Sequence, residues 1–209
     1  MRMIFRSLLR GDLMKSFSVE YWLPLATAGD SQARFHLGKI FSCGLGVPQD
    51  YKMAIYWFQL AAEQGHDDAQ FHLGWVYHLG LGGYKDFQKA SEWYQRSALQ
   101  GHAEAQFHLG RLYAVSDLRN DVFAAEWFLC AAKQGHSSAQ FKLGWMYHLG
   151  MGIEKSDRQA FYWFTLAAEQ DHAGAQASLG EMYKHGWGVE QDDVVAQQWF
   201  CRAKTMPPP

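Results

Sequence analysis

The chain has 209 residues, a formal net charge of −2 and only 19% charged residues. This balance gives no basic surface for nucleic acid or for an anionic membrane, and no apolar stretch approaches the ~20 residues of a membrane-spanning helix. Hydrophobic residues make up 48% of the chain, so a packed core is expected.

Residues 1–14 are expected to stand apart from the main domain. Arg6 and Arg10 interrupt the apolar residues of this segment, which argues against a secretory signal. We therefore expect a cytoplasmic protein, or a periplasmic or secreted one if its true N-terminus differs. The pair Ile4-Phe5 aligns with Ile40-Phe41 one period later, which predicts a vestigial helix over residues 1–13.

The main domain is predicted over residues 15–204 and begins with half a repeat at 15–30. Tyr21-Trp22 and Leu25-Ala26 fit one helix that ends at Gly29. At the other end, the Pro-rich tail 205–209 cannot continue a helix.

From residue 31 onwards one pattern returns with a nearly fixed period. Its clearest mark is a Leu-Gly pair, with the leucines at Leu37, Leu73, Leu109, Leu143 and Leu179. The spacing is 36, 36, 34 and 36 residues, which is typical of stacked supersecondary units. Five full repeats are predicted at about 31–66, 67–102, 103–136, 137–172 and 173–204.

The first half of each repeat is predicted to be a helix, as the repeat from residue 69 illustrates. Ala69, Leu73 and Tyr77 share one face at helical spacing. A glycine such as Gly74 recurs inside this helix in every repeat, which indicates that a neighbour approaches too closely for a side chain. Gly80-Leu81-Gly82 then ends the helix, because glycine tolerates the left-handed backbone of a helix C-terminus.

The second half of each repeat carries its own helix signals. Residues of preferred N-cap type stand at the start of all five second helices, namely Asp50, Asp86, Asn120, Ser156 and Asp192. A Trp-aromatic pair follows in each helix and is assigned to the core: Trp57-Phe58, Trp93-Tyr94, Trp127-Phe128, Trp163-Phe164 and Trp199-Phe200.

The ends of the second helices and one connecting loop show local departures from the pattern. Gly65, Gly101 and Gly135 follow the second helices of three repeats. In the repeat over residues 137–172 this position holds Asp171, a residue that tolerates the left-handed backbone region. The repeat with the 34-residue spacing lacks the Gly-x-Gly loop between residues 114 and 120. We expect that it has lost two residues from this loop and none from its helices.

This pattern resembles the Sel1-like repeat (SLR) family, which belongs to the tetratricopeptide-type α/α solenoids. The repeat over residues 33–65 matches it nearly throughout, in Leu37-Gly38, Phe41, Gly44-Leu45-Gly46-Val47, Asp50, Ala54, Trp57-Phe58 and Ala61-Ala62. The resemblance covers about nine-tenths of the chain. It implies an all-α fold, a right-handed α/α superhelical solenoid of helix-turn-helix repeats. It also implies a bacterial adaptor that binds proteins.

In a solenoid of this kind the first helices line a concave groove, where a protein or peptide partner would bind. The candidate contact residues lie opposite the predicted core face of these helices: Phe35, Lys39, Phe71, Trp75, His78, Phe107, Arg111, Phe141, Trp145 and His148. Trp75 and Trp145 are the preferred anchors, since Trp and Arg dominate interface hot spots. Arg111 suggests that the partner carries an acidic group. Alternatively, the stack buries the phenylalanines as ordinary core.

Catalytic and metal sites find little support in the sequence. Equivalent histidines of successive repeats lie on helices about 8–10 Å apart, too far for most to share a zinc ion, so no metal or cofactor is predicted. Ser137-Ser138 is interpreted as a helix cap. A hydrolase or metal-dependent enzyme, and a secreted or periplasmic effector, remain the alternative functions.

The three cysteines are expected to be free and largely buried.

Overall fold

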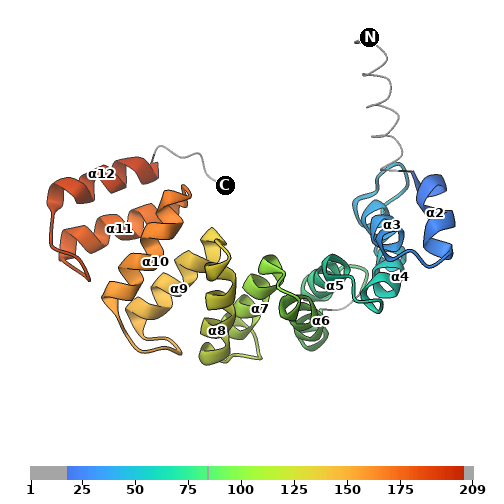
Figure 1. Cartoon of the computed structure of the whole chain (residues 1–209), viewed down its shortest axis with the longest axis horizontal. Coiled ribbons are helices and arrows are strands. Elements are labelled where there is room, and N and C mark those ends of the chain that lie inside the picture. The colour runs from blue at the N-terminus through green and yellow to red at the C-terminus, as the bar shows by residue number, and fades with distance from the viewer. Residues whose placement is uncertain (1–17, 84, 205–209) are drawn as a thin grey trace, which may run out of the picture. The chain divides into compact units, whose positions relative to one another are not determined.

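The computed structural model describes residues 18–83 and 85–204, and every regular element in them is an α-helix (Figure 1). The vestigial helix predicted over residues 1–13 lies outside the described residues. The helices in chain order are α2 (Val19–Thr27), α3 (Ser31–Cys43), α4 (Tyr51–Ala62), α5 (Asp67–Leu79), α6 (Phe87–Leu99), α7 (Ala103–Val115), α8 (Asp121–Lys133), α9 (Ser137–Leu149), α10 (Asp157–Glu169), α11 (Ala173–His185) and α12 (Asp193–Lys204). The predicted all-α solenoid of helix-turn-helix repeats is confirmed.

The chain divides into two compact units at residue 102. The N-terminal half contains α2 to α6, and the C-terminal half contains α7 to α12. Within each half, the first helix of a repeat packs on the second helix of the same repeat, and that second helix packs on the first helix of the next. None of the described helices is long and apolar enough to cross a membrane.

The predicted N-caps of the second helices are confirmed. The Asp50 carboxylate accepts hydrogen bonds from the backbone N–H groups of Lys52 and Met53 at 2.9 and 3.1 Å. The carboxylate of Asp192 accepts from Val194 and Val195 in the same way. Each cap satisfies N–H groups that have no partner inside the helix, so the side chains fix where the second helices begin.

Histidines cap three of the first helices, which the sequence interpretation missed. In α5, α9 and α11 the ring Nδ1 of the residue before the helix accepts from the backbone N–H three residues later, at His66, His136 and His172. The interpretation of Ser137-Ser138 as the cap of α9 is therefore wrong. Ser137 is already the first helical residue, and His136 precedes it with the extended backbone of an N-cap residue.

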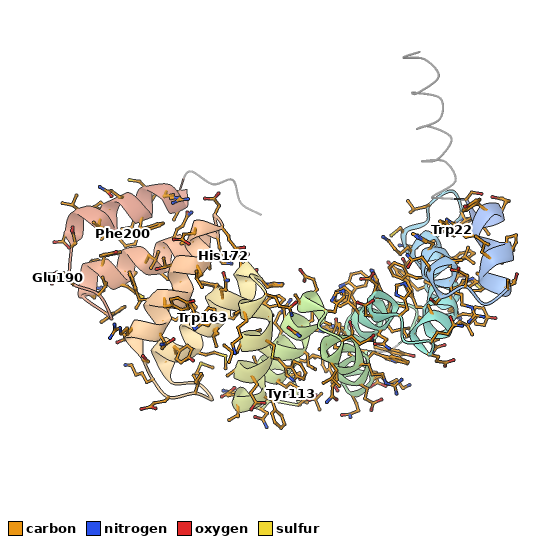
Figure 2. All side chains as sticks on the ribbon, viewed as in Figure 1. Trp22, Tyr113, Trp163, His172, Glu190 and Phe200 are labelled. Carbon is orange, nitrogen blue, oxygen red and sulfur yellow. The ribbon has the colours of Figure 1, made fainter. Side chains whose placement is uncertain are left out.

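The recurring helical glycine makes room for an aromatic ring of the same repeat. A Cβ placed on Gly74 would lie 2.5 Å from the Tyr94 ring, and one on Gly180 would lie 2.5 Å from the Phe200 ring. Phe200 lies between α12 and α11 in Figure 2. Phe58, Phe128 and Phe164 face the equivalent glycines. The predicted close approach is confirmed, and the neighbour is the ring that follows the tryptophan.

The Gly-x-Gly loops pack on the preceding repeat. Gly152 has a φ of +67° and Gly188 a φ of +69°, a region that favours glycine. A Cβ on Gly152 would clash with the carbonyl of Asp121 at the start of α8, and one on Gly188 with the carbonyl of Asp157 at the start of α10. These loops therefore hold neighbouring repeats together.

Buried glutamines connect the end of one repeat to the first helix of the next. The Gln140 amide donates to the Ala132 carbonyl at 3.1 Å. Its oxygen accepts from the Gln170 amide at 2.7 Å. Gln70 makes the corresponding bonds, to Ala62 and from Gln100, in the N-terminal half. The glutamine amide thus adds a second hydrogen bond to a helix-end carbonyl that already accepts from the backbone N–H three residues later.

Two further expectations have opposite outcomes. The 34-residue repeat keeps 13-residue helices at α7 and α8, as long as α5 and α6, so its two missing residues come from the loop as predicted.

The expectation of buried thiols is wrong. Cys43, Cys130 and Cys201 are all free and exposed, because each lies on the outer face of its helix.

Candidate functional site

Each predicted phenylalanine packs against the histidine that ends its own repeat, directly before the first helix of the next repeat. The ring centroids lie 4.6 Å apart for Phe35–His66, 4.9 Å for Phe71–His102, 4.5 Å for Phe107–His136 and 4.6 Å for Phe141–His172. Phe35 is buried in the core beside Phe58. Its assignment to an open groove is therefore corrected, since its ring cannot reach a partner. The other three are half-buried and serve mainly to join repeats.

The buried environment also affects the histidines beside these rings. Burial lowers the pKa of His172, whose ring stacks on Phe141. Burial and the nearby Lys39 ammonium lower the pKa of His72 to about 4. At neutral pH these rings are uncharged, which suits their contacts with aromatic neighbours.

The position after each Leu-Gly pair faces outward and varies from repeat to repeat. It holds Lys39, Trp75, Arg111, Trp145 and Glu181 on α3, α5, α7, α9 and α11. The Lys39 ammonium and the Arg111 guanidinium lie over the phenylalanine of their own helix, at 5.6 and 5.8 Å from the ring centroids. Trp75 is half-buried, whereas 38% of Trp145 is exposed.

The two predicted histidines have different surroundings. The His78 ring lies edge-on to Phe87 and Tyr94. The Nδ1 atom of His148 lies 2.6 Å from a carboxylate oxygen of Asp157 on α10, which fixes the ring orientation. His148 also lies close to Trp145, with ring centroids 5.6 Å apart.

A cavity of about 470 Å³ opens between α9 and α11 in the C-terminal half; we call it the α9–α11 cavity. It brings together the predicted residues Phe141, Trp145 and His148. Other elements complete its lining, with Phe164 from α10, Glu181 from α11, Trp187 from the loop and Phe200 from α12. The walls are mainly aromatic, and Glu181 is the one acidic residue among the described residues that line it.

A second cavity, of about 340 Å³, lies on the other side of Trp145 and is called the α7–α9 cavity. Arg111 and Lys142 line it together with apolar residues that include Val115 and Met151. Both basic side chains are exposed. Trp145 is therefore a wall shared by two cavities, one with cations at its edge and one with a carboxylate.

The sequence interpretation missed Lys142 and Trp187 as site residues. Trp187 lies in the loop after α11, at a place where other repeats hold Leu45, Leu81 or Met151. The change from an aliphatic to an aromatic residue at this repeat position was the available signal. Lys142 follows Phe141 at a position that holds histidine in the three preceding repeats and Ser178 in the last, so its change to a cation was a signal of the same kind.

One group of side chains in the N-terminal half has the composition of a metal site. Ligand atoms of His66, Asp67 and Asp68 lie within 4.8 Å of one another. Both ring nitrogens of His66 are already engaged, since Nδ1 caps α5 and Nε2 lies 3.0 Å from the Gln32 side-chain oxygen. A metal would have to displace the cap, so we assign no ion to this group.

The α9–α11 cavity also contains a serine close to the His148–Asp157 pair. The Ser178 hydroxyl donates to the carbonyl of Gly174 in its own helix, at 3.0 Å. No hydrogen bond joins Ser178 to His148 among the described residues of this cavity. A nucleophilic serine needs its base within hydrogen-bonding reach, so the arrangement does not have the geometry of a hydrolase site.

Comparisons with known proteins identify the repeat. A family model described as the Sel1 repeat matches residues 31–66, 67–102, 103–136, 137–172 and 173–206. A Sel1 repeat protein from Oxalobacter formigenes is 30% identical, with a TM-score of 0.81 over 87% of this chain and 76% of that one. No curated protein matches the chain.

Two further solved structures are similar. A protective antigen of uropathogenic Escherichia coli strains, described as displaying an SLR fold, is 35% identical, with a TM-score of 0.56. The match covers 91% of this chain and 49% of that protein. An immunity protein from Pseudomonas aeruginosa, 18% identical, shares the fold with a TM-score of 0.53 over 89% of this chain and 72% of that one. With five matched repeats that span most of its length, the chain belongs to the Sel1 repeat family.

Proposed function

We propose that the protein is a non-enzymatic adaptor that binds a segment of a partner protein on the outward face of its first helices. In the C-terminal half this face comprises α7, α9 and α11, with Trp145 as the central anchor. The observation that carries the proposal is the exposed Trp145 indole between two open cavities. Lys39, Trp75 and His78 offer a second contact surface in the N-terminal half.

The repeat architecture supports this proposal. Sel1 repeats form a typical scaffold for protein–protein interactions, and stacked repeats present an extended surface for binding. The cavities are lined mainly by aromatic and aliphatic side chains with a few charged groups, as is usual for binding sites. A partly exposed tryptophan is a common hot spot of interfaces.

The test compares the wild type with Trp145→Ala. Partners captured from extracts of the source cells are purified and titrated against both proteins by calorimetry. Loss of a hot-spot tryptophan typically costs about 2 kcal/mol or more, so binding should weaken by roughly 30-fold. Tyr162→Ala is the matched control, because Tyr162 is 52% exposed on α10 and lines neither cavity.

Equal binding by folded Trp145→Ala and wild type would refute the proposal. Circular dichroism should first show that both variants keep the helical content of the wild type. Partner binding lost equally in Tyr162→Ala and Trp145→Ala would place the contact surface elsewhere.

A further inference from the structure

We propose that the C-terminal half selects partner segments by charge order. The segment is extended and carries an acidic, an apolar and a basic side chain at alternate positions. The acidic group would enter the α7–α9 cavity, the apolar group would contact Trp145, and the basic group would enter the α9–α11 cavity. This inference rests on the proposed function and specifies the chemistry of the partner.

The charge order follows from one repeat position. Arg111, Trp145 and Glu181 occupy the same place on the consecutive first helices α7, α9 and α11. The row therefore runs from a cation through an indole to a carboxylate. Lys142 adds a second cation on the Arg111 side. A partner that lies along the row meets these groups in a fixed order.

The basic end of the row is available to an anion. The Arg111 guanidinium lies 5.8 Å from the Phe107 ring centroid, and the Lys142 ammonium lies 5.9 Å from that of Phe141. Among the described residues, neither cation forms a salt bridge with an acidic side chain. Two cations beside an apolar hollow attract a carboxylate whose aliphatic stem fills that hollow.

The acidic end of the row suits a cation on an apolar stem. Trp145 and Trp187 line the cavity, and His185 stacks on the Trp187 ring with the centroids 4.6 Å apart. The faces of such rings attract lysine or arginine head groups, so the exposed Trp145 indole is the ring that can receive one. The Glu181 carboxylate lies 3.3 Å from His185 Nε2 and remains about half exposed, so it can also accept a cation from a partner. A lysine or arginine would place its methylene groups among the rings and its charge beside Glu181.

The position of the two cavities fits an extended segment. Both cavities border Trp145, and an extended chain advances about 3.3 Å per residue. Side chains at positions i, i+2 and i+4 share one face of such a chain and span about 13 Å. With the middle side chain on Trp145, the outer two reach the cavities on either side.

The test uses four fluorescently labelled peptides that contain Asp-Ser-Leu-Ser-Lys, Lys-Ser-Leu-Ser-Lys, Asp-Ser-Leu-Ser-Asp or Gln-Ser-Leu-Ser-Gln. Their affinities for the full chain are measured by fluorescence anisotropy at low salt. The Asp/Lys peptide should bind at least about tenfold more tightly than the other three. Glu181→Lys should shift the preference to the Asp/Asp peptide. Arg111→Glu combined with Lys142→Glu should shift it to the Lys/Lys peptide.

Each other outcome overturns the inference in a recognisable way. If all four peptides bind equally and Trp145→Ala weakens them all, the charge order is wrong while the groove remains. If no peptide binds, the inference fails, and the titration of Trp145→Ala with the captured partner decides separately whether the adaptor surface stands. If unlabelled protein displaces the Asp/Lys peptide and the chain self-associates through this face, the occupant is a second copy of the chain. The substituted side chains are solvent-accessible, so circular dichroism should show unchanged folding.

Discussion

The contact between Gly144 and the facing Phe164 ring predicts that Gly144→Ala destabilises the protein. In most helices the same substitution is stabilising. A Cβ on Gly144 would lie 2.6 Å from two atoms of the Phe164 ring, which is only 2% exposed. In an open helix, Gly→Ala stabilises by about 1 kcal/mol. Forcing a methyl group into a packed core typically costs 1–3 kcal/mol. We therefore expect Gly144→Ala to be destabilising by up to about 2 kcal/mol.

The measurement is chemical and thermal unfolding followed by circular dichroism. For a unit of about 100 residues, 1 kcal/mol corresponds to a change of roughly 4–8 °C in Tm, so the melting temperature should fall clearly. Gly83→Ala is the control, because a Cβ at Gly83 would meet no atom within 4 Å. This control should leave the stability nearly unchanged.

A double-mutant cycle identifies the ring as the cause. Phe164→Leu alone should destabilise by opening space in the core. In the Gly144→Ala/Phe164→Leu protein the new methyl group occupies part of that space, so the loss should be smaller than the two single losses added. The coupling should exceed about 0.5 kcal/mol. Stabilisation by Gly144→Ala, or additive effects in the cycle, would refute the close-contact explanation.

Three further predictions concern the histidines, the glutamines and the thiols. Since the pKa of His72 is lowered to about 4, the unfolded state takes up its proton first on acidification. The free energy of unfolding should fall from about pH 6.5 to about pH 4, by on the order of 3 kcal/mol, and urea unfolding of His72→Gln should show a smaller loss. Gln140→Leu removes one of the hydrogen bonds on the Ala132 carbonyl and one acceptor of the Gln170 amide, both of which keep another partner, and should cost about 1 kcal/mol in the same assay. All three exposed cysteines should react with a thiol reagent in the native protein, and protection of any one would contradict its exposure.

The helices and their boundaries were predictable because local residue chemistry determines them. Asp50 and Asp192 cap helices through their own side chains, and Gly80 ends α5 in the left-handed region. Asp171 has a φ of +61°, so it substitutes for glycine as expected. These features depend on residues adjacent in the sequence, which is why periodicity and cap preferences reveal them.

The histidine caps and the exposed cysteines were not predictable from the same rules. Histidine is not among the preferred N-cap residues, yet His136 caps α9 because its ring is held against Phe107 of α7. That support comes from a residue distant in the sequence. The preference of free cysteine for the interior gave the wrong result for Cys130, whose place on α8 faces away from the core.

The candidate site was predictable only in part, because its shape depends on contacts between repeats. Periodicity placed Phe141, Trp145 and His148 on one helix face. It did not reveal that Trp187 and Phe200 close the α9–α11 cavity from a loop and from the last helix. The Phe35 correction has the same origin, since neighbouring rings from α4 and α5 enclose it.

The difference between constant and variable repeat positions supports the proposed recognition surface. The position after each leucine is always glycine, because an aromatic ring of the same repeat fills the space. The next position meets no such constraint, since its side chain points outward, and it holds Lys39, Trp75, Arg111, Trp145 or Glu181. Substitutions there alter the surface without disturbing the core. Partner specificity can therefore change at this position, repeat by repeat, while the stacking contacts stay the same.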